Sequence, residues 1–286
     1  MIVDQISYAL DGLTGRLGQK PNCPSCGANS SDAVDRKYFH ALLRCPQCAL
    51  LFRYPRESGD EAKGFYQDEY SQPGLTTDLP SPAELERLME SNFAGTPKSF
   101  NRFIELMDLL MVRKPAKILD FGANWGYGLL QYSRAGHHVV GYEVSKPRAA
   151  YGKNLGFDIL TEWEPVEEAG PYDICFSSHV LEHTPDPAEA MRRQLSVLKP
   201  GGFLLAVFPN GSADFRAAQY DKFHRLWGKV HPVLPTEEFV CNVLPKDRFF
   251  VGAFDDLAKT KLADWDRASP LEGSTSTNEL LVVYQA

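Results

Sequence analysis

Four cysteines near the N-terminus have the residue type and spacing of metal ligands. Cys23 and Cys26 form one C-x-x-C pair, Cys45 and Cys48 form a second, and 18 residues separate the two pairs. Two tight turns of this kind bring four thiolates to the corners of the tetrahedron that Zn²⁺ prefers. We therefore predict a zinc ribbon whose ion, fully ligated by protein, has a structural role. Two disulfides are the alternative; we favour metal because nothing in the sequence points to secretion.

A second group of residues has the spacing of a nucleotide-type binding site. The apolar run that ends at Asp120 continues directly into the glycine-rich segment FGANWGYG. Gly122 and Gly126 allow the backbone to approach a ligand closely, and Asn124 tolerates the left-handed conformation. Glu143 closes the next apolar run, where a carboxylate can hold a ribose diol. Together these features predict an adenosine-type ligand, with a purely structural turn as the alternative.

Three histidines are placed where proton transfer would occur. His179 and His183 follow a predicted strand, and His231 lies in the segment after the next strand. Ligands of open α/β sheets bind at the carboxyl ends of the strands, and histidine titrates near neutral pH. We predict that at least one of the three acts as a general base. A structural or packing role for each is the alternative.

The frame for these residues is an alternation of apolar and helical segments. From residue 115 onward this alternation predicts βαβ units and an α/β fold with a Rossmann-like, doubly wound, mostly parallel sheet. The strand-like runs are Ile118–Phe121, Val139–Tyr142, Phe157–Leu160, Tyr172–Phe176, Phe203–Phe208, Phe249–Phe254 and Glu279–Tyr284. We expect the last two to form an antiparallel pair at the edge of a seven-stranded sheet.

Capping signals mark three helices. Ser81, followed by proline and then Glu84, predicts the start of one helix, and Thr96 before proline predicts the start of a second. A third begins after Asp186 and is expected to stop at the sequence KPGG, residues 199–202.

Composition and charge limit the classes of function. The chain has 286 residues, 43% of them hydrophobic, and a formal net charge of −7. No apolar run approaches the roughly 20 residues of a membrane span, so we expect a cytoplasmic protein without a membrane partner. The charge argues against nucleic acid as the main partner, because phosphate binding needs clustered Lys and Arg. We divide the chain into a zinc ribbon (1–60), a linker with helices (61–114) and a core (115–286) with an insertion (211–248).

The core resembles the class I S-adenosylmethionine-dependent methyltransferases. ILDFGANWG matches the acid and glycine loop of that family, with Asn124 at the middle glycine, and FSSHVLEH and LKPGGFLLAVFPN resemble its fourth and fifth strands. The resemblance implies S-adenosylmethionine as cofactor, with Asp120 and the glycines along its methionine part and Glu143 at the ribose. The residues expected at the cofactor are Asp120, Gly122, Asn124, Gly126, Glu143, Glu162 and Ser178. Rossmann dehydrogenases fit less well, because the glycines depart from G-x-G-x-x-G.

The resemblance also leaves two questions about the substrate side. The HVLEH segment is similar to the cation site of small-RNA 2′-O-methyltransferases, which would make His179, Glu182, His183 and His231 metal ligands. That family has Glu where this chain has His179, which weakens the case for Mg²⁺ and leaves a transition metal open. The insertion is rich in aromatic residues that either stack on a substrate ring or cover the edge of the sheet.

The sequence therefore predicts a zinc-ribbon methyltransferase that acts on oxygen of a small-molecule or sugar-containing acceptor. The alternatives are a deoxysugar C-methyltransferase, an RNA methyltransferase with a zinc ribbon, and a non-catalytic cofactor-binding scaffold. The two acids, Asp120 and Glu143, argue against the scaffold.

Overall fold

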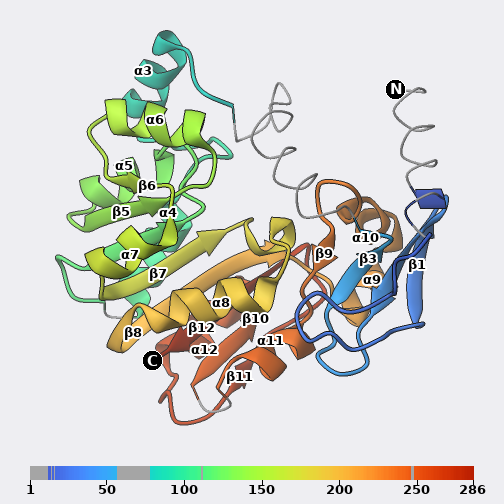
Figure 1. Cartoon of the computed structure of the whole chain (residues 1–286). Helices are drawn as coiled ribbons and strands as arrows, with labels where there is room; N and C mark the ends of the chain where they lie inside the picture. Colours follow the sequence, from blue (N-terminus) through green and yellow to red (C-terminus); the bar gives the residue numbers. More distant parts are fainter. Residues whose placement is uncertain (1–11, 14, 16, 57–77, 111, 246–247) are drawn as a thin grey trace.

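The computed structural model describes residues 12–13, 15, 17–56, 78–110, 112–245 and 248–286. Two sheets organise this part of the chain, a large one in the core and a small one formed mainly by the N-terminal segment (Figure 1). Residues 61–77, the first part of the predicted linker with helices (61–114), lie outside the described residues. Among the helices that the structure describes, none has the length and apolar character to span a bilayer.

The large sheet confirms the predicted doubly wound α/β fold. Its strand order is β11-β10-β12-β8-β7-β4-β5-β6, and the run from β8 to β6 is parallel. The strands are β4 (Lys117–Phe121), β5 (His138–Tyr142), β6 (Ile159–Leu160), β7 (Tyr172–Ser178), β8 (Leu198–Pro209), β10 (Phe249–Gly252), β11 (Leu271–Glu272) and β12 (Glu279–Gln285).

Helices cover both faces of this sheet, which explains why its central strands are apolar throughout. Side chains of α7, α8 and α11 pack with Leu119 and Cys175 on one face. Side chains of α4, α5 and α12 pack with Ile118 and Ile174 on the other. The helices are α3 (Pro82–Glu90), α4 (Asn101–Leu109), α5 (Tyr127–Arg134), α6 (Lys146–Asn154), α7 (Trp163–Ala169), η2 (Leu181–His183), α8 (Pro187–Ser196), α9 (Ala213–Ala218), α10 (Tyr220–Leu226), α11 (Glu237–Val243) and α12 (Asp256–Ala263).

The structure differs from the sequence prediction in three local details. The sheet has eight strands rather than seven, because the short strand β11 pairs with β10 and occupies the edge; the expected antiparallel pair, β10 and β12, lies further inside. The second helix begins at Asn101 and not at Thr96, whose hydroxyl instead donates to the carbonyl of Phe93. Residues 199–202 belong to strand β8 rather than to a helix stop.

The small sheet joins the N-terminal segment to the insertion. Its antiparallel order is β1 (Ala33–Lys37), β2 (His40–Arg44), β3 (Leu51–Tyr54) and β9 (Val233–Leu234). Figure 1 shows β9, drawn in orange, beside the blue strands of this sheet. Strand β9 comes from the insertion, from a stretch that has no clear strand signal in the sequence.

Most of the large aromatic residues of the insertion are buried, and three of them pack against the small sheet. Phe215, Phe223 and Trp227 are at most 1% exposed and pack with Leu42 and Leu51 of β2 and β3. Phe239 of α11 is fully buried in the main core. Of the two alternatives for the insertion, stacking on a substrate is therefore wrong for these four rings, because they are buried in the protein core.

Candidate functional site

The glycine-rich turn between β4 and α5 has the backbone that its sequence predicts. Gly122, Asn124 and Gly126 all have positive φ, at 87°, 53° and 92°. These conformations fold the chain back tightly, so that the amides of Gly122 and Ala123 both donate to the carbonyl of Tyr142 at the end of β5. The turn therefore lies at the carboxyl ends of β4 and β5, the edge where open parallel sheets bind ligands.

Two buried acids, Asp120 and Glu143, flank this turn. Asp120 is the penultimate residue of β4, in register with Gly141, and Glu143 directly follows β5. Glu143 is fixed by two backbone amides: its Oε2 accepts from Asn124 N at 2.9 Å and its Oε1 accepts from Ser145 N at 2.8 Å. Each carboxylate oxygen retains a second lone pair, which is what a ribose diol needs.

Burial shifts both acids toward the neutral form. Burial and the nearby charge of Glu143 raise the pKa of Asp120 to about 7. Burial also raises the pKa of Glu143, against the two amide hydrogen bonds. A ligand that carries positive charge and hydroxyl donors compensates for this cost. S-adenosylmethionine has both, with a sulfonium, an ammonium and a ribose, so the two acids fit the predicted cofactor.

Two other expected cofactor residues lie at the same edge of the sheet. Ser178 is the last residue of β7. Glu162 is exposed at the start of α7, two residues beyond Leu160, whose carbonyl accepts from the amide of Glu143. The structure thus places both residues at the carboxyl edge of the sheet, where the turn also lies.

His179 has carboxylates on both sides of its ring. Its Nδ1 lies 3.2 Å from Glu182 Oε1 and its Nε2 lies 3.0 Å from Glu279 Oε1. Carboxylates only accept, so both ring nitrogens donate and the ring is an imidazolium. Burial opposes this charge, but the hydrogen bonds to the two acids outweigh it and raise the pKa of His179 to about 10. Such a ring does not accept a further proton.

His183 and His231 each donate from Nδ1 to a backbone carbonyl. The Nδ1 of His183 donates to the carbonyl of Val230 at 2.8 Å, and the Nδ1 of His231 donates to the carbonyl of Leu226 at 2.6 Å. A neutral imidazole that donates at Nδ1 carries its lone pair on Nε2. Burial lowers the pKa of His183 to about 4, against the nearby charge of Glu182. The two rings meet edge to face, with centroids 4.7 Å apart.

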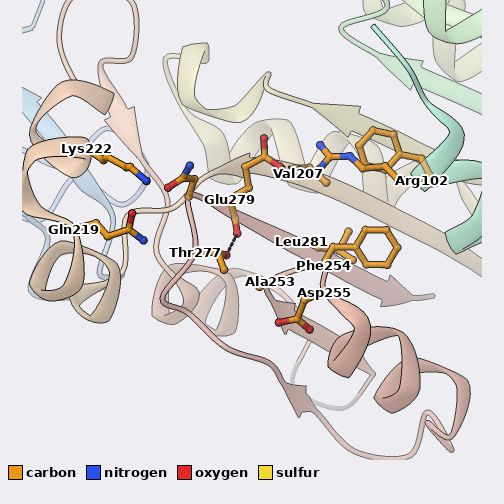
Figure 2. Close-up of a pocket in the computed structure, with 12 residues that line it drawn as sticks. Arg102, Val207, Gln219, Lys222, Ala253, Phe254, Asp255, Thr277, Glu279 and Leu281 are labelled. Atoms are coloured by element: carbon orange, nitrogen blue, oxygen red, sulfur yellow. Dashed lines mark hydrogen bonds and ion pairs between the residues drawn. The ribbon is translucent and has the colours of Figure 1, made fainter. Parts of the chain in front are cut away.

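A pocket of about 550 Å³ is lined by Glu279, the residue whose carboxylate contacts His179 (Figure 2). Arg102 and Glu279 lie on one side of it, and Gln219 and Lys222 lie on the other. Glu279 joins the pocket to the histidine, because its Oε2 accepts from Arg102 Nη1 at 3.0 Å while its Oε1 faces His179. Apolar lining comes from residues of α4, β8 and β12 and from the two residues after β10, namely Phe103, Val207, Leu281, Ala253 and Phe254.

Comparison with known families shows which protein family the chain belongs to. A family model described as a methyltransferase domain matches residues 98–241, half of the chain. The chain belongs to the methyltransferase-domain family. The resemblance to S-adenosylmethionine-dependent methyltransferases is thereby confirmed. The matched segment begins before residue 115, and helix α4 indeed packs into the core.

Relatives of this methyltransferase include two curated bacterial enzymes. It is 26% identical over 167 residues to the ubiquinone biosynthesis O-methyltransferase of Ralstonia nicotianae, which covers 54% of this chain and 63% of the relative. It is 31% identical over 102 residues to the enzyme of that name from Caulobacter vibrioides, covering 32% and 40%. The chain thus matches less than two thirds of each relative.

Among solved structures, the methyltransferase is similar to the plantazolicin methyltransferase BpumL, which was solved in complex with SAH. The TM-score is 0.51 and the identity 14%, with 79% of this chain and 95% of the other covered. At this identity the similarity supports the fold alone.

The four cysteines of the methyltransferase converge as their spacing predicts. Their Sγ atoms all lie within 4.8 Å of one another. Cys23 and Cys48 are 3.5 Å apart at sulfur, and Cys26 and Cys45 are 3.4 Å apart. Sulfurs bound tetrahedrally to one zinc at about 2.3 Å are about 3.8 Å apart, so the cluster fits Zn²⁺ with little adjustment.

Sequence reasoning missed Glu279, which contacts His179, and Arg102, which contacts Glu279; both residues line the pocket. Glu279 lies 100 positions after His179 and Arg102 lies on α4, so only the fold brings them to the site. It also missed Asp35 of β1, which lies in the small sheet and contacts the insertion. None of the three belongs to a local motif.

Proposed function

We propose that the protein transfers a methyl group from S-adenosylmethionine to a hydroxyl oxygen of a small-molecule or sugar-containing acceptor. The observation that carries the proposal is the pair of buried acids, Asp120 and Glu143, on either side of a left-handed glycine turn at the carboxyl edge of a parallel sheet. The names of the curated relatives, both O-methyltransferases, favour oxygen over carbon as the methylated atom.

The cofactor residues would act by charge and by hydrogen bonding. When bound, S-adenosylmethionine supplies an electrophilic methyl group on a sulfonium sulfur. Asp120, once ionised, offsets the positive charge of the ligand, and Glu143 accepts from the ribose hydroxyls. Gly122 and Gly126 have no side chains that would block the ligand. The backbone amide of Asn124 donates to Glu143 and so joins the turn to that acid. Ser178 and Glu162 border the same edge.

The pocket lined by Glu279 is the proposed acceptor site. Its phenylalanines offer apolar surface to a ring, and Gln219, Lys222 and Arg102 offer hydrogen-bond donors to hydroxyl or carbonyl groups. In-line transfer requires the acceptor oxygen about 3 Å from the methyl carbon. Helix α4 lies between the cofactor turn and the acceptor pocket. Phe100, just before α4, packs over Gly128 next to the carboxylate of Asp120, and Phe103 of α4 lines the pocket.

The reaction releases one proton, since the O–H of the acceptor becomes O–CH₃ and the sulfonium becomes a neutral thioether. Of the three predicted histidines, the imidazolium His179 does not accept that proton. We assign to it the positioning of Glu279 and Glu182 instead. His183 and His231, whose Nε2 atoms carry lone pairs, are the proposed proton acceptors.

The four cysteines are proposed to hold a structural Zn²⁺. With four thiolate ligands the ion has no open position, so its contribution is to folding of the small sheet. Because β9 pairs with β3 in that sheet, the ion would also fix the insertion that carries His231.

The test of the function is calorimetric titration with S-adenosylhomocysteine. We expect micromolar binding, and at least tenfold weaker binding for Asp120→Ala and for Glu143→Ala, with the cysteine-bound zinc retained in both. A tenfold change corresponds to about 1.4 kcal/mol, the scale of one charge-assisted hydrogen bond. Glu86→Ala, an exposed acid on α3, is the control. Unchanged affinity in both site variants would contradict the assignment.

A further inference from the structure

A second group of potential metal ligands lies apart from the four cysteines. Glu182, His183 and His231 each offer one ligand atom, and these atoms lie within 4.8 Å of one another. Ligand atoms on one zinc-class ion at about 2.1 Å are separated by up to about 4.2 Å, so side-chain shifts of roughly 1 Å or less suffice to bind one.

Both histidines are oriented as metal ligands usually are. Each donates its Nδ1 proton to a backbone carbonyl, His183 to Val230 and His231 to Leu226. This fixes the tautomer and aims the Nε2 lone pair away from the carbonyl; for His183 it points toward Glu182, with Nε2 3.9 Å from Oε1. A histidine ligand whose other ring nitrogen donates to a backbone carbonyl is the common arrangement at metal sites.

The carboxylate of Glu182 supplies a second, independent observation. Its side chain is 0% exposed. Its Oε1 accepts from His179, whereas no hydrogen-bond donor within the described residues reaches its Oε2. A buried carboxylate oxygen without a donor is costly, and a bound cation removes that cost.

We propose that Glu182, His183 and His231 form a second metal site, for a divalent transition-metal ion. Two nitrogens and one oxygen favour zinc, cobalt, manganese or iron over Mg²⁺, which prefers oxygen ligands. His179 is not a ligand, because both of its nitrogens face carboxylates. The ligand set is therefore smaller than the four-residue alternative considered from the sequence.

Three protein ligands leave at least one coordination position open, which is typical of catalytic rather than structural sites. Val180, which precedes η2, packs against Gly122 of the cofactor turn: a Cβ at Gly122 would lie 2.3 Å from its Cγ2. Resting on the proposed function, a bound ion would replace His183 and His231 as the means of handling the proton. It would bind the acceptor hydroxyl and lower its pKa, the proton would pass to solvent, and the two imidazoles would remain ligands of the metal.

The small sheet holds the third ligand in place. His231 lies just before β9, and β9 pairs with β3 through Leu51–Leu234 and Phe52–Val233. The amide of Gly228 donates to the carbonyl of His231 at 3.1 Å and closes the loop that carries the ring. The ribbon therefore contributes to this site by positioning, without a ligand of its own.

Metal counting on the full chain tests the proposal without cofactor or acceptor. Metal-free protein is titrated with Co²⁺, and bound metal is measured by equilibrium dialysis and elemental analysis. We expect two equivalents for the wild type and one for His231→Gln and for Glu182→Gln, both of which keep a polar side chain. The equivalent that remains should show thiolate charge-transfer absorption, which reports that the four-cysteine site is intact and folded.

The controls separate this site from its surroundings. His138→Ala, at an exposed position at the start of β5, should retain two equivalents. A large excess of Mg²⁺ should leave the second Co²⁺ bound. One equivalent in the wild type, or two equivalents in His231→Gln and Glu182→Gln, would overturn the proposal, and displacement by Mg²⁺ would overturn the choice of metal. The Co²⁺ titration tests the metal site, and the titration with S-adenosylhomocysteine tests the cofactor site. Failure of one proposal can therefore be distinguished from failure of the other.

Discussion

The indole N–H of Trp227 donates to the carboxylate of Asp35 at 2.7 Å, across 192 positions of sequence. Asp35 also accepts from His224 Nδ1 at 2.7 Å and from the hydroxyl of Tyr220 at 2.9 Å. One buried acid of β1 thus accepts hydrogen bonds from three side chains, two in α10 and one in the residue that follows α10. This joins the small sheet to the insertion at a point separate from the pairing of β3 with β9.

Asp35→Ala should lower the free energy of unfolding by about 3 kcal/mol. The substitution leaves the indole N–H of Trp227, a residue only 1% exposed, buried without an acceptor, at a cost of about 1 to 3 kcal/mol, and it removes the hydrogen bonds of the other two donors. Urea denaturation measures the change. Asp32→Ala, an exposed acid just before the same strand, should change stability by less than about 0.5 kcal/mol. Equal effects of the two variants would contradict the role of Asp35.

The stabilisation by Asp35 should depend on pH in a defined direction. Burial raises the pKa of this carboxyl, but the hydrogen bonds from Trp227 and His224 outweigh burial, and the net pKa lies below its ordinary value. An acid whose pKa is lower in the folded state stabilises the protein above its unfolded pKa of about 4. The stability difference between wild type and Asp35→Asn should therefore be constant near pH 6 and shrink as the pH falls below about 4. A difference that grows on acidification would contradict this sign.

Loss of the metal at the four cysteines should loosen the insertion as well as the ribbon. Because β9 completes the small sheet, Cys45→Ser should increase amide exchange in β3 and also in residues 228–234, measured by hydrogen-exchange mass spectrometry. The amides of the parallel core, such as those of β4 and β7, should be unaffected. Cys241→Ser, which changes a cysteine outside the cluster, should leave both regions unchanged. Increased exchange confined to the ribbon would show that the insertion does not depend on it.

The parts of the site that the sequence predicted are those set by local rules. Asp120, the two glycines and Asn124 lie within seven consecutive residues, and left-handed conformations are favourable for glycine and tolerated by asparagine. The caps of Ser81 and Asp186 likewise form because a side-chain oxygen accepts from amides two or three residues ahead.

The parts that the sequence did not predict depend on tertiary contacts. The helix predicted from Thr96 starts later because the amide of Phe100 donates to Gln131 Oε1 on α5 at 2.7 Å. Strand β9 has two residues and no periodicity of its own; its partner β3 defines it. Glu279 approaches His179 only because β12 inserts antiparallel between β10 and β8.

Affinity for S-adenosylmethionine should rise with pH through about 7. Burial and the charge of Glu143 raise the pKa of Asp120 to about 7 in the free protein, and a cationic ligand favours the ionised form. Calorimetry between pH 5.5 and 8.5 should show an increase of up to about tenfold per unit below pH 7 and a plateau above it. Asp120→Asn should bind weakly with little pH dependence, and Glu86→Gln should follow the wild type. A flat wild-type profile would contradict the raised pKa.

Gly122→Ala should be more damaging than an alanine at a glycine with the same backbone. Gly122 has φ +87°, and a Cβ there would lie 2.3 Å from Val180 Cγ2; Gly136 has φ +92°, and its Cβ would meet nothing within 4 Å. The left-handed conformation alone costs alanine about 1 kcal/mol, so Gly136→Ala measures that cost. Gly122→Ala adds overpacking, for a total of about 3 kcal/mol by urea denaturation. Displacement of Val180 should also shift η2 and weaken binding of S-adenosylhomocysteine at least tenfold. If the two variants lost the same free energy of unfolding, Val180 would have to move away from the cofactor turn without an energetic cost, which would contradict this prediction.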